Sequence, residues 1–183
     1  MALTRLGGAN AISGTIPATN VANATLNNIT ALPAAVKTGK ILQVVTANDN
    51  TNTSNTSSST YVAATDVDIS ITPTSTSSKI FVEFNVCVYQ TLESGAKDSS
   101  FQYELYRDST LIYTNGSLQY YTSAGWSGNV RYMRYFSRID TPSSTSAINY
   151  NFKFRNPHNS GSIQINQGSQ YSDMRAMEIA GWL

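Results

Sequence analysis

The chain has 183 residues, a formal net charge of +1 and 13% charged residues, while 40% of its residues are hydrophobic. With so little net charge and no basic or acidic run, the sequence argues against a partner such as nucleic acid or an anionic membrane surface. The single cysteine, Cys87, excludes an intramolecular disulfide framework and a cysteine-based zinc site. Its place in an apolar run predicts a buried, inert thiol.

No span reaches the roughly 18–20 apolar residues that a membrane helix needs. The N-terminus also lacks the apolar core of a secretory signal, which predicts synthesis in a host cytoplasm without membrane insertion. The sequence contains no glycine-rich phosphate loop and no nucleophile elbow. We therefore expect no enzyme activity, catalytic residue, cofactor or metal.

Residues 1–39 are predicted to form an extended segment that anchors and oligomerises the chain. The first 36 residues carry one charged side chain, Arg5, and cannot build a core of their own. Such a segment is ordered only by burying its sparse aliphatic side chains against copies of itself or another protein, and three chains wound together would do so. The aliphatic residues expected to do this are Ile12, Ile16, Val21, Leu26, Ile29 and Leu32.

Residues 40–183 are predicted to form an all-β head. Strands are expected over 40–45 and 60–71, with the Ser-, Thr- and Asn-rich stretch 46–60 between them as a loop. Residues 79–90 are the clearest strand, because apolar side chains alternate along it at period two. Its predicted inward face consists of Ile80, Val82, Phe84, Val86 and Val88.

The same alternation continues toward the C-terminus. Further strands are expected over 101–108, 110–114, 129–139, 147–155, 162–166 and 174–183. Their predicted inward faces include Phe101, Tyr103, Leu105, Val130, Tyr132, Phe136, Ile148, Tyr150, Phe152 and Phe154. About eight or nine strands at turn spacing, without a helix, favour a two-sheet antiparallel sandwich of the jelly-roll type. An immunoglobulin-type sandwich is the alternative, with fewer and shorter strands.

Aromatic side chains gather in residues 118–136. Flat rings beside polar groups suit contacts with sugars or adaptable protein surfaces. The residues proposed for receptor or glycan binding are Trp126, Tyr120, Tyr121 and Tyr132. Alternatively, the tyrosines fill the core or a subunit interface.

The carboxylates offer a weaker alternative. Asp66 and Asp68 are expected on one strand face, where Glu83 from a neighbouring strand could oppose them across a glycosidase cleft. A calcium ion at Asp66 and Asp68 is a second possibility. The plainer interpretation is that these groups face solvent.

Three segments resemble proteins of phage tail fibres and virion fibres, notably those of marine and cyanobacterial phages. They are residues 7–35 followed by 39–45, the stretch "ITPTSTSSKIFVEFNV" (71–86) and the closing "MRAMEIAG" (174–181). The resemblance implies a homotrimer whose N-terminus binds a tail, collar or capsid protein and whose jelly-roll head faces outward. The short stalk suggests a short fibre, spike or decoration, which attaches to a host-surface glycan or protein or only decorates the particle.

Overall fold

The computed structural model describes residues 41–56, 59–92, 98–116, 118–121, 128–157 and 161–181, which all belong to one compact unit, Gly39–Leu183. Residues 1–40, with the six proposed anchoring aliphatics, lie outside the described residues, so their role and the domain boundary stay predictions. The described residues form strands and turns without a helix, and none of them forms a helix able to span a membrane.

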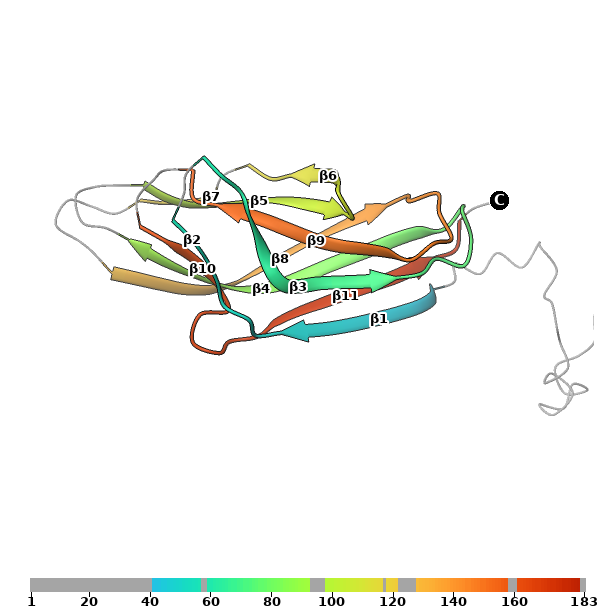
Figure 1. Cartoon of the computed structure of the whole chain (residues 1–183), viewed down its shortest axis with the longest axis horizontal. Helices are drawn as coiled ribbons and strands as arrows, with labels where there is room; N and C mark the ends of the chain where they lie inside the picture. Colours follow the sequence, from blue (N-terminus) through green and yellow to red (C-terminus); the bar gives the residue numbers. More distant parts are fainter. Residues whose placement is uncertain are drawn as a thin grey trace, which may run out of the picture. The chain divides into compact units, whose positions relative to one another are not determined.

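Two antiparallel sheets make up this unit (Figure 1). Sheet A contains β1 (Ile41–Asp49), β2 (Thr53–Asn55), β4 (Lys79–Leu92), β8 (Gly128–Asp140), β10 (Ile163–Ile165) and β11 (Ser172–Ile179). Sheet B contains β3 (Val62–Ile71), β5 (Asp98–Arg107), β6 (Thr110–Thr114), β7 (Leu118–Tyr121) and β9 (Ile148–Arg155). The predicted all-β sandwich is confirmed.

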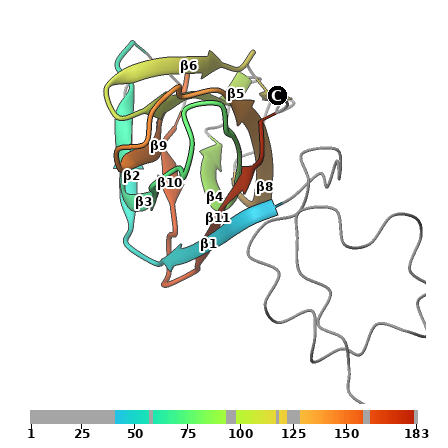
Figure 2. The same ribbon diagram turned by 90° about the vertical axis from the view of Figure 1, so that its right-hand side faces the viewer.

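The strand pairing follows the pattern of a jelly roll. Strand β1 pairs with β11, β3 with β9, β4 with β8, and β5 with β6, all antiparallel. The eight long strands β1, β3, β4, β5, β6, β8, β9 and β11, here called the principal strands, therefore pair as one long hairpin in which the first pairs with the last. Successive pairs alternate between sheet A and sheet B. Figure 2 views the sandwich end-on, with β1, β11, β4 and β8 along one side and β3, β9 and β6 along the other. Two Greek keys arranged in this way define the jelly roll.

Period-two alternation places one face of each long strand in the core. All five predicted inward residues of β4 are fully buried, and the predicted inward residues of β5 and β9 are buried as well. Burying a large aliphatic or aromatic side chain contributes about 1.5–3 kcal/mol. This shared inner layer holds the two sheets together.

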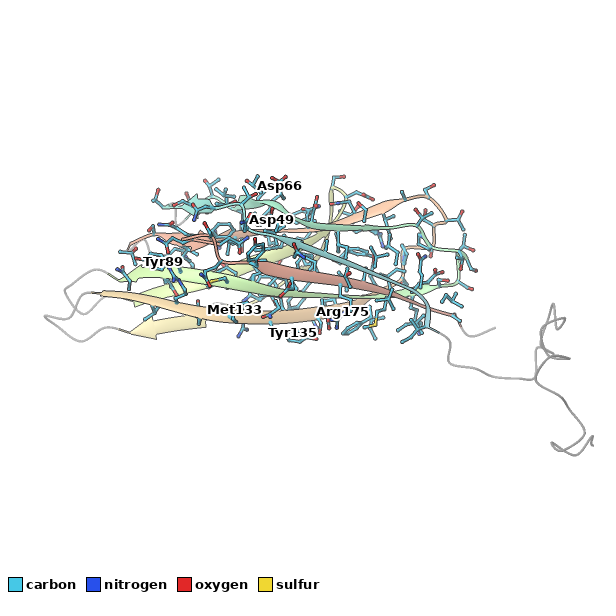
Figure 3. The ribbon with its side chains drawn as sticks, turned by 90° about the horizontal axis from the view of Figure 1, so that it is seen from below. Asp49, Asp66, Tyr89, Met133, Tyr135 and Arg175 are labelled. Carbon is cyan, nitrogen blue, oxygen red and sulfur yellow. The ribbon has the colours of Figure 1, made fainter. Side chains whose placement is uncertain are left out.

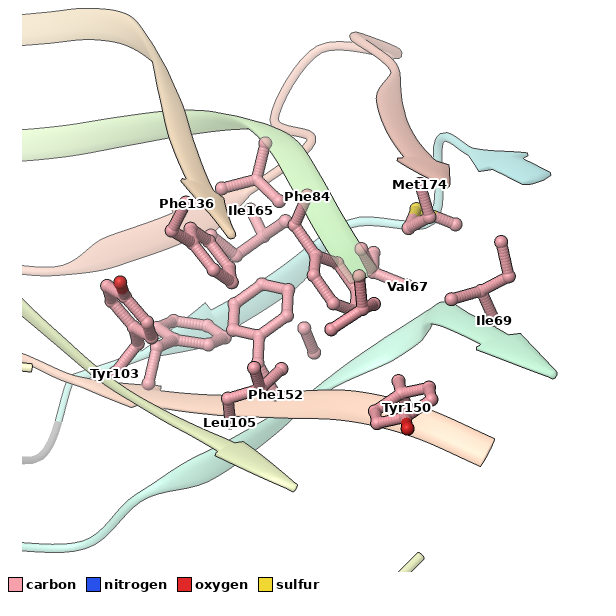
Figure 4. Packing of buried hydrophobic residues seen from close by; sticks show 14 of the residues in the cluster. Val67, Ile69, Phe84, Tyr103, Leu105, Phe136, Tyr150, Phe152, Ile165 and Met174 are labelled. Carbon is pink, nitrogen blue, oxygen red and sulfur yellow. The ribbon is translucent and has the colours of Figure 1, made fainter. Parts of the chain in front are cut away.

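Aromatic rings join the sheets at the centre of the sandwich (Figure 4). Phe136 of β8 stacks on Phe84 of β4 at a centroid distance of 5.2 Å. It also stacks on Tyr103 of β5 at 4.1 Å and meets Phe152 of β9 edge-on at 5.3 Å. Offset and edge-on pairs add to the hydrophobic contribution of burial, so Phe136 links both sheets through one side chain.

The prediction of a loop over 46–60 is wrong at two places. Strand β1 continues to Asp49 along β11, and Thr53–Asn55 form β2 beside β10. The polar side chains of β2 replace missing backbone partners: Asn55 Nδ2 donates to the carbonyl of Phe154 at 2.7 Å, and Thr53 Oγ1 accepts from the amide of Thr65 at 2.8 Å. Buried polar groups that are hydrogen-bonded can replace apolar side chains in a strand.

A part-buried polar network links the two sheets where β5 and β8 end. Arg107 of β5 donates to both carboxylate oxygens of Asp140 in β8, at 3.0 and 2.8 Å. Tyr150 of β9 donates to Asp140 at 2.8 Å. Burial and this bond to the carboxylate raise the pKa of Tyr150 well above its ordinary value. Asp140 therefore links sheet A to two strands of sheet B.

A second carboxylate, Glu178 of β11, is fully buried and collects hydrogen bonds from three residues. Its donors are the amide and hydroxyl of Thr74 (both 2.7 Å), Ser78 Oγ (2.6 Å) and Gln43 Nε2 (2.7 Å). Burial alone would raise the pKa of Glu178, but these hydrogen bonds outweigh it and hold the pKa below its ordinary value. Glu178 thus joins β1, β11 and the turn before β4.

Candidate functional site

The outer face of sheet A carries most of the exposed apolar surface among the described residues. Eight large hydrophobic side chains are exposed among the described residues, and six of them belong to β1 and β8, two edge strands of sheet A. They are Ile41, Leu42, Val44, Met133, Tyr135 and Ile139. A concentration of exposed apolar side chains on one face indicates an interaction surface.

One end of this face is apolar across all four principal strands. The pairing register aligns Val44 of β1, Met177 of β11, Phe81 of β4 and Ile139 of β8 in one row. The two edge residues are the most open, with Val44 53% and Ile139 62% exposed. We call this row, together with Ile41 and Leu42 at the start of β1, the apolar end.

Farther along the same strands lies a polar row, again fixed by the pairing register. It consists of Asn48 of β1, Asp173 of β11, Asn85 of β4 and Tyr135 of β8. These side chains line a depression of about 420 Å³, together with Thr46, Glu83 and Arg175 from the adjoining row. The polar row therefore lines an open hollow on the sheet.

Two hydrogen-bonded contacts fix the aromatic wall of this depression. Tyr135, 54% exposed, donates from its hydroxyl to Glu83 Oε2 at 2.9 Å. The other oxygen of Glu83 accepts from Arg175 Nη1 at 2.5 Å. Figure 3 shows Tyr135, Met133 and Arg175 along one side of the sandwich, away from Asp49 and Asp66. The ring is held at its polar end while its faces remain accessible.

The outer face of sheet B is arranged differently, because its polar side chains bind one another. Asn149 donates to Asp68 at 3.0 Å and to Ser70 at 3.1 Å. Lys153 lies 4.3 Å from the ring centroid of Tyr106. The Tyr106 hydroxyl donates to Glu104 at 2.7 Å, and this bond is the main cause that raises the pKa of Tyr106 to about 12.

Arg155 completes this network. Its Nε donates to Gln102 at 2.8 Å, and its guanidinium carbon lies 4.5 Å from the Tyr61 ring centroid. The described polar groups named here thus bind one another across β3, β5 and β9.

The predicted aromatic residues do not form one described cluster. Tyr132 is half-buried on the inner side of β8, packs against the core and donates to Gln90 at 3.0 Å. Tyr120 and Tyr121 lie in β7 of sheet B, where their backbone pairs with β5, and their side chains are outside the described residues. Trp126 also lies outside them. The binding role of these four residues stays a prediction.

Tyr135 was not among the predicted binding residues, although the sequence held a signal for it. Alternation along 129–139 puts Tyr132 on the side of Phe136, which is the core side, and therefore puts Tyr135 on the outer side. The prediction followed the number of aromatic residues in this segment and did not separate those on the core side from those on the outer side. What the sequence could not supply is the register that brings Tyr135 beside Asn85, Asp173 and Asn48.

The proposed arrangement of carboxylates is wrong for Glu83. It lies on the outer face of sheet A, whereas Asp66 and Asp68 belong to β3 of sheet B, so they cannot face one another across a cleft. Asp68 accepts from Asn149, and Asp66 lies 3.4 Å from Thr51 Oγ1, which bonds Asp49 at 3.0 Å. Among the described residues, no three His, Cys, Asp or Glu side chains gather closely enough to hold a metal ion.

Cys87 is buried, as predicted. Burial raises the pKa of its thiol, which keeps the thiol protonated and poorly nucleophilic.

Comparison with known proteins gives only distant matches to solved structures. No protein-family model and no curated protein matches it. Among solved structures it is similar to the particle protein in T=1 particles derived from infectious bursal virus, with 11% identity and a TM-score of 0.38. It is also similar to VP2 of the infectious bursal disease virus subviral particle, with 13% identity and a TM-score of 0.35.

In both comparisons the match covers 76% of this chain but only 36% and 38% of the other chain. The chain thus spans little more than a third of the virus proteins that it matches. At these values the likeness does not indicate what this chain binds or assembles with.

Proposed function

We propose that the chain is a structural protein of a bacteriophage particle, without catalytic activity. In this proposal it forms a short homotrimeric fibre, spike or decoration. Residues 1–39 bind a tail, collar or capsid protein, and the jelly-roll head faces outward to attach to the host surface. The sequence resemblance of residues 7–35, 39–45, 71–86 and 174–181 to virion-fibre proteins supports this function.

The observation that carries the proposal is the position of the apolar end. Residues 1–40 lead directly into Ile41, the first residue of the exposed apolar surface on sheet A. If three N-terminal segments associate, chain continuity brings the starts of three β1 strands close to the common axis. Burying Val44 and Ile139 between copies would then remove apolar surface from water, which is the main driving force for association.

Antibodies against the full chain test its place on the particle of the phage that encodes it. We expect them to label intact particles in electron micrographs, and their Fab fragments to reduce adsorption to host cells. Absence of label on intact particles would refute a virion protein. Label without any effect of the Fab on adsorption would favour the alternative, a decoration that binds no receptor.

The aromatic residues of 118–136 have their own test within this function. Phage carrying Trp126→Ala in this chain should adsorb more slowly than the parent, while particle yield and antibody labelling stay unchanged. Adsorption at the parental rate would remove Trp126 from the receptor site.

A further inference from the structure

The polar row on sheet A contains three side chains that make no hydrogen bond or ion pair with the rest of the described head. Among the described residues, the carboxylate of Asp173 and the side-chain amides of Asn48 and Asn85 have no hydrogen-bond or ion-pair partner. The register nevertheless places them next to one another on adjacent strands. Comparable amides on sheet B, such as Asn149 and Asn151, bond to neighbouring side chains. The donors and acceptors of the polar row are therefore available to a ligand.

The aromatic wall beside these groups is already in position. Because Glu83 holds the Tyr135 hydroxyl and Arg175 holds Glu83, a ligand that stacks on the ring does not have to immobilise it first. Preorganisation of this kind reduces the entropic cost of binding. A depression of about 420 Å³ is in the size range of small-ligand sites.

The chemistry of the depression selects the class of ligand. A tyrosine ring covers the apolar face of a sugar, while two amides and a carboxylate both donate and accept hydrogen bonds with its hydroxyl groups. The charged groups are Asp173, Glu83 and Arg175, two negative and one positive. Because negative charge predominates, an acidic sugar is disfavoured and a neutral sugar is not.

We propose that this depression binds a neutral hexose unit of a surface glycan, with Tyr135 as the stacking ring and Asp173, Asn85 and Asn48 as hydroxyl-binding groups. This inference rests on the proposed role in host attachment, and it specifies the class of ligand that the head would bind. None of its lining residues belongs to residues 120–126, on which the receptor-binding prediction from the sequence mostly falls.

Binding of the purified full chain to defined polysaccharides tests the site. The probes are mannan, galactan and dextran as neutral polymers and polygalacturonate as an acidic one, with saturation-transfer NMR and calorimetry as readouts. We expect at least one neutral polymer to bind and polygalacturonate not to bind. Tyr135→Ala and Asp173→Ala should each weaken that binding at least tenfold. Tyr171→Ala is the matched control, because Tyr171 is 56% exposed and lies outside the polar row.

Each alternative outcome rejects the site in a recognisable way. Binding to none of the neutral polymers, preference for polygalacturonate, or unchanged binding by Tyr135→Ala would overturn it. A neutral-polymer affinity lost only in Trp126→Ala would move the site to the aromatic segment. If Tyr135→Ala instead converts an oligomer to a monomer, the polar row is a subunit contact and not a sugar site.

Antibody labelling of the particle separates this test from that of the proposed function. Particles that are labelled but whose protein binds no neutral glycan retain the virion function without the sugar site. Absence of label rejects the virion function itself, whatever the polysaccharides show.

Discussion

The two outer faces of the sandwich are built from similar strands but use their side chains differently. On sheet B, polar and aromatic groups form a network that extends from Asp68 through Asn149 to Asn151, beside the Lys153–Tyr106 and Arg155–Tyr61 contacts. On sheet A, large apolar side chains are exposed at one end, and in the polar row the side chains of Asn48, Asn85 and Asp173 have no partner among the described residues. In the described part of sheet B, polar side chains thus bind one another, whereas sheet A leaves polar side chains without a partner beside exposed apolar ones.

This comparison predicts that substitutions on the two faces affect different properties. On sheet A they should change association or ligand binding and leave folding nearly intact. On sheet B, and at the buried carboxylate of Glu178, they should change the free energy of unfolding.

The largest effect is expected for Ile139→Glu in the apolar end. Light scattering of the parent full chain at micromolar concentration should give three times the chain mass of 19.9 kDa. A carboxylate buried in the subunit contact would be desolvated without a partner, so the variant should be monomeric. Leu111→Glu is the control, because Leu111 is 48% exposed on β6 of sheet B and its change should leave the trimer intact. A trimer of the Ile139 variant would exclude this end from the interface.

Glu178→Gln is expected to have the largest effect on folding. The substitution replaces charge-assisted hydrogen bonds from Ser78, Thr74 and Gln43 by weaker ones, at a cost of about 2–3 kcal/mol. Because the pKa of Glu178 is lower in the folded than in the unfolded chain, its contribution is complete above the unfolded pKa. The contribution disappears as the pH falls through the folded pKa.

Urea unfolding at several pH values measures this effect. The difference between parent and variant should be full at neutral pH and vanish in acid. A difference that does not change with pH would show that the ionisation of Glu178 does not stabilise the fold.

A smaller loss is expected for Arg155→Ala on sheet B. The variant loses the hydrogen bond to Gln102 and the contact with the Tyr61 ring, together about 1 kcal/mol. Arg175→Ala on sheet A is the counterpart, and its half-exposed ion pair with Glu83 should matter less. Urea unfolding of both variants compares the faces directly, and an equal or larger loss for Arg175→Ala would contradict the distinction between them.

The smallest effect on folding is expected for Asp173→Asn. Its carboxylate has no partner among the described residues, so the change in unfolding free energy should stay within about 0.5 kcal/mol. The same variant tests whether the carboxylate itself is needed for sugar binding. A loss of stability similar to that of Glu178→Gln would show that Asp173 has a structural role.

The sequence predicted the fold better than the site, for a physical reason. Period-two alternation depends only on neighbours along the chain, and it identified the buried faces of β4, β5 and β9 correctly. Strand β2 was missed because Thr53 and Asn55 are stabilised by partners far away in sequence. The polar row is also long-range, because it exists only where β1, β11, β4 and β8 align.

An electron-microscopy structure of the assembled full chain at side-chain resolution tests most directly whether the outer face of sheet A forms the contacts with other copies. We predict that Val44 and Ile139 contact neighbouring copies while Tyr135 and Asp173 stay open to solvent beside that contact. Copies that pack through Arg155 and Lys153 on sheet B, with the apolar end of sheet A facing water, would contradict the account.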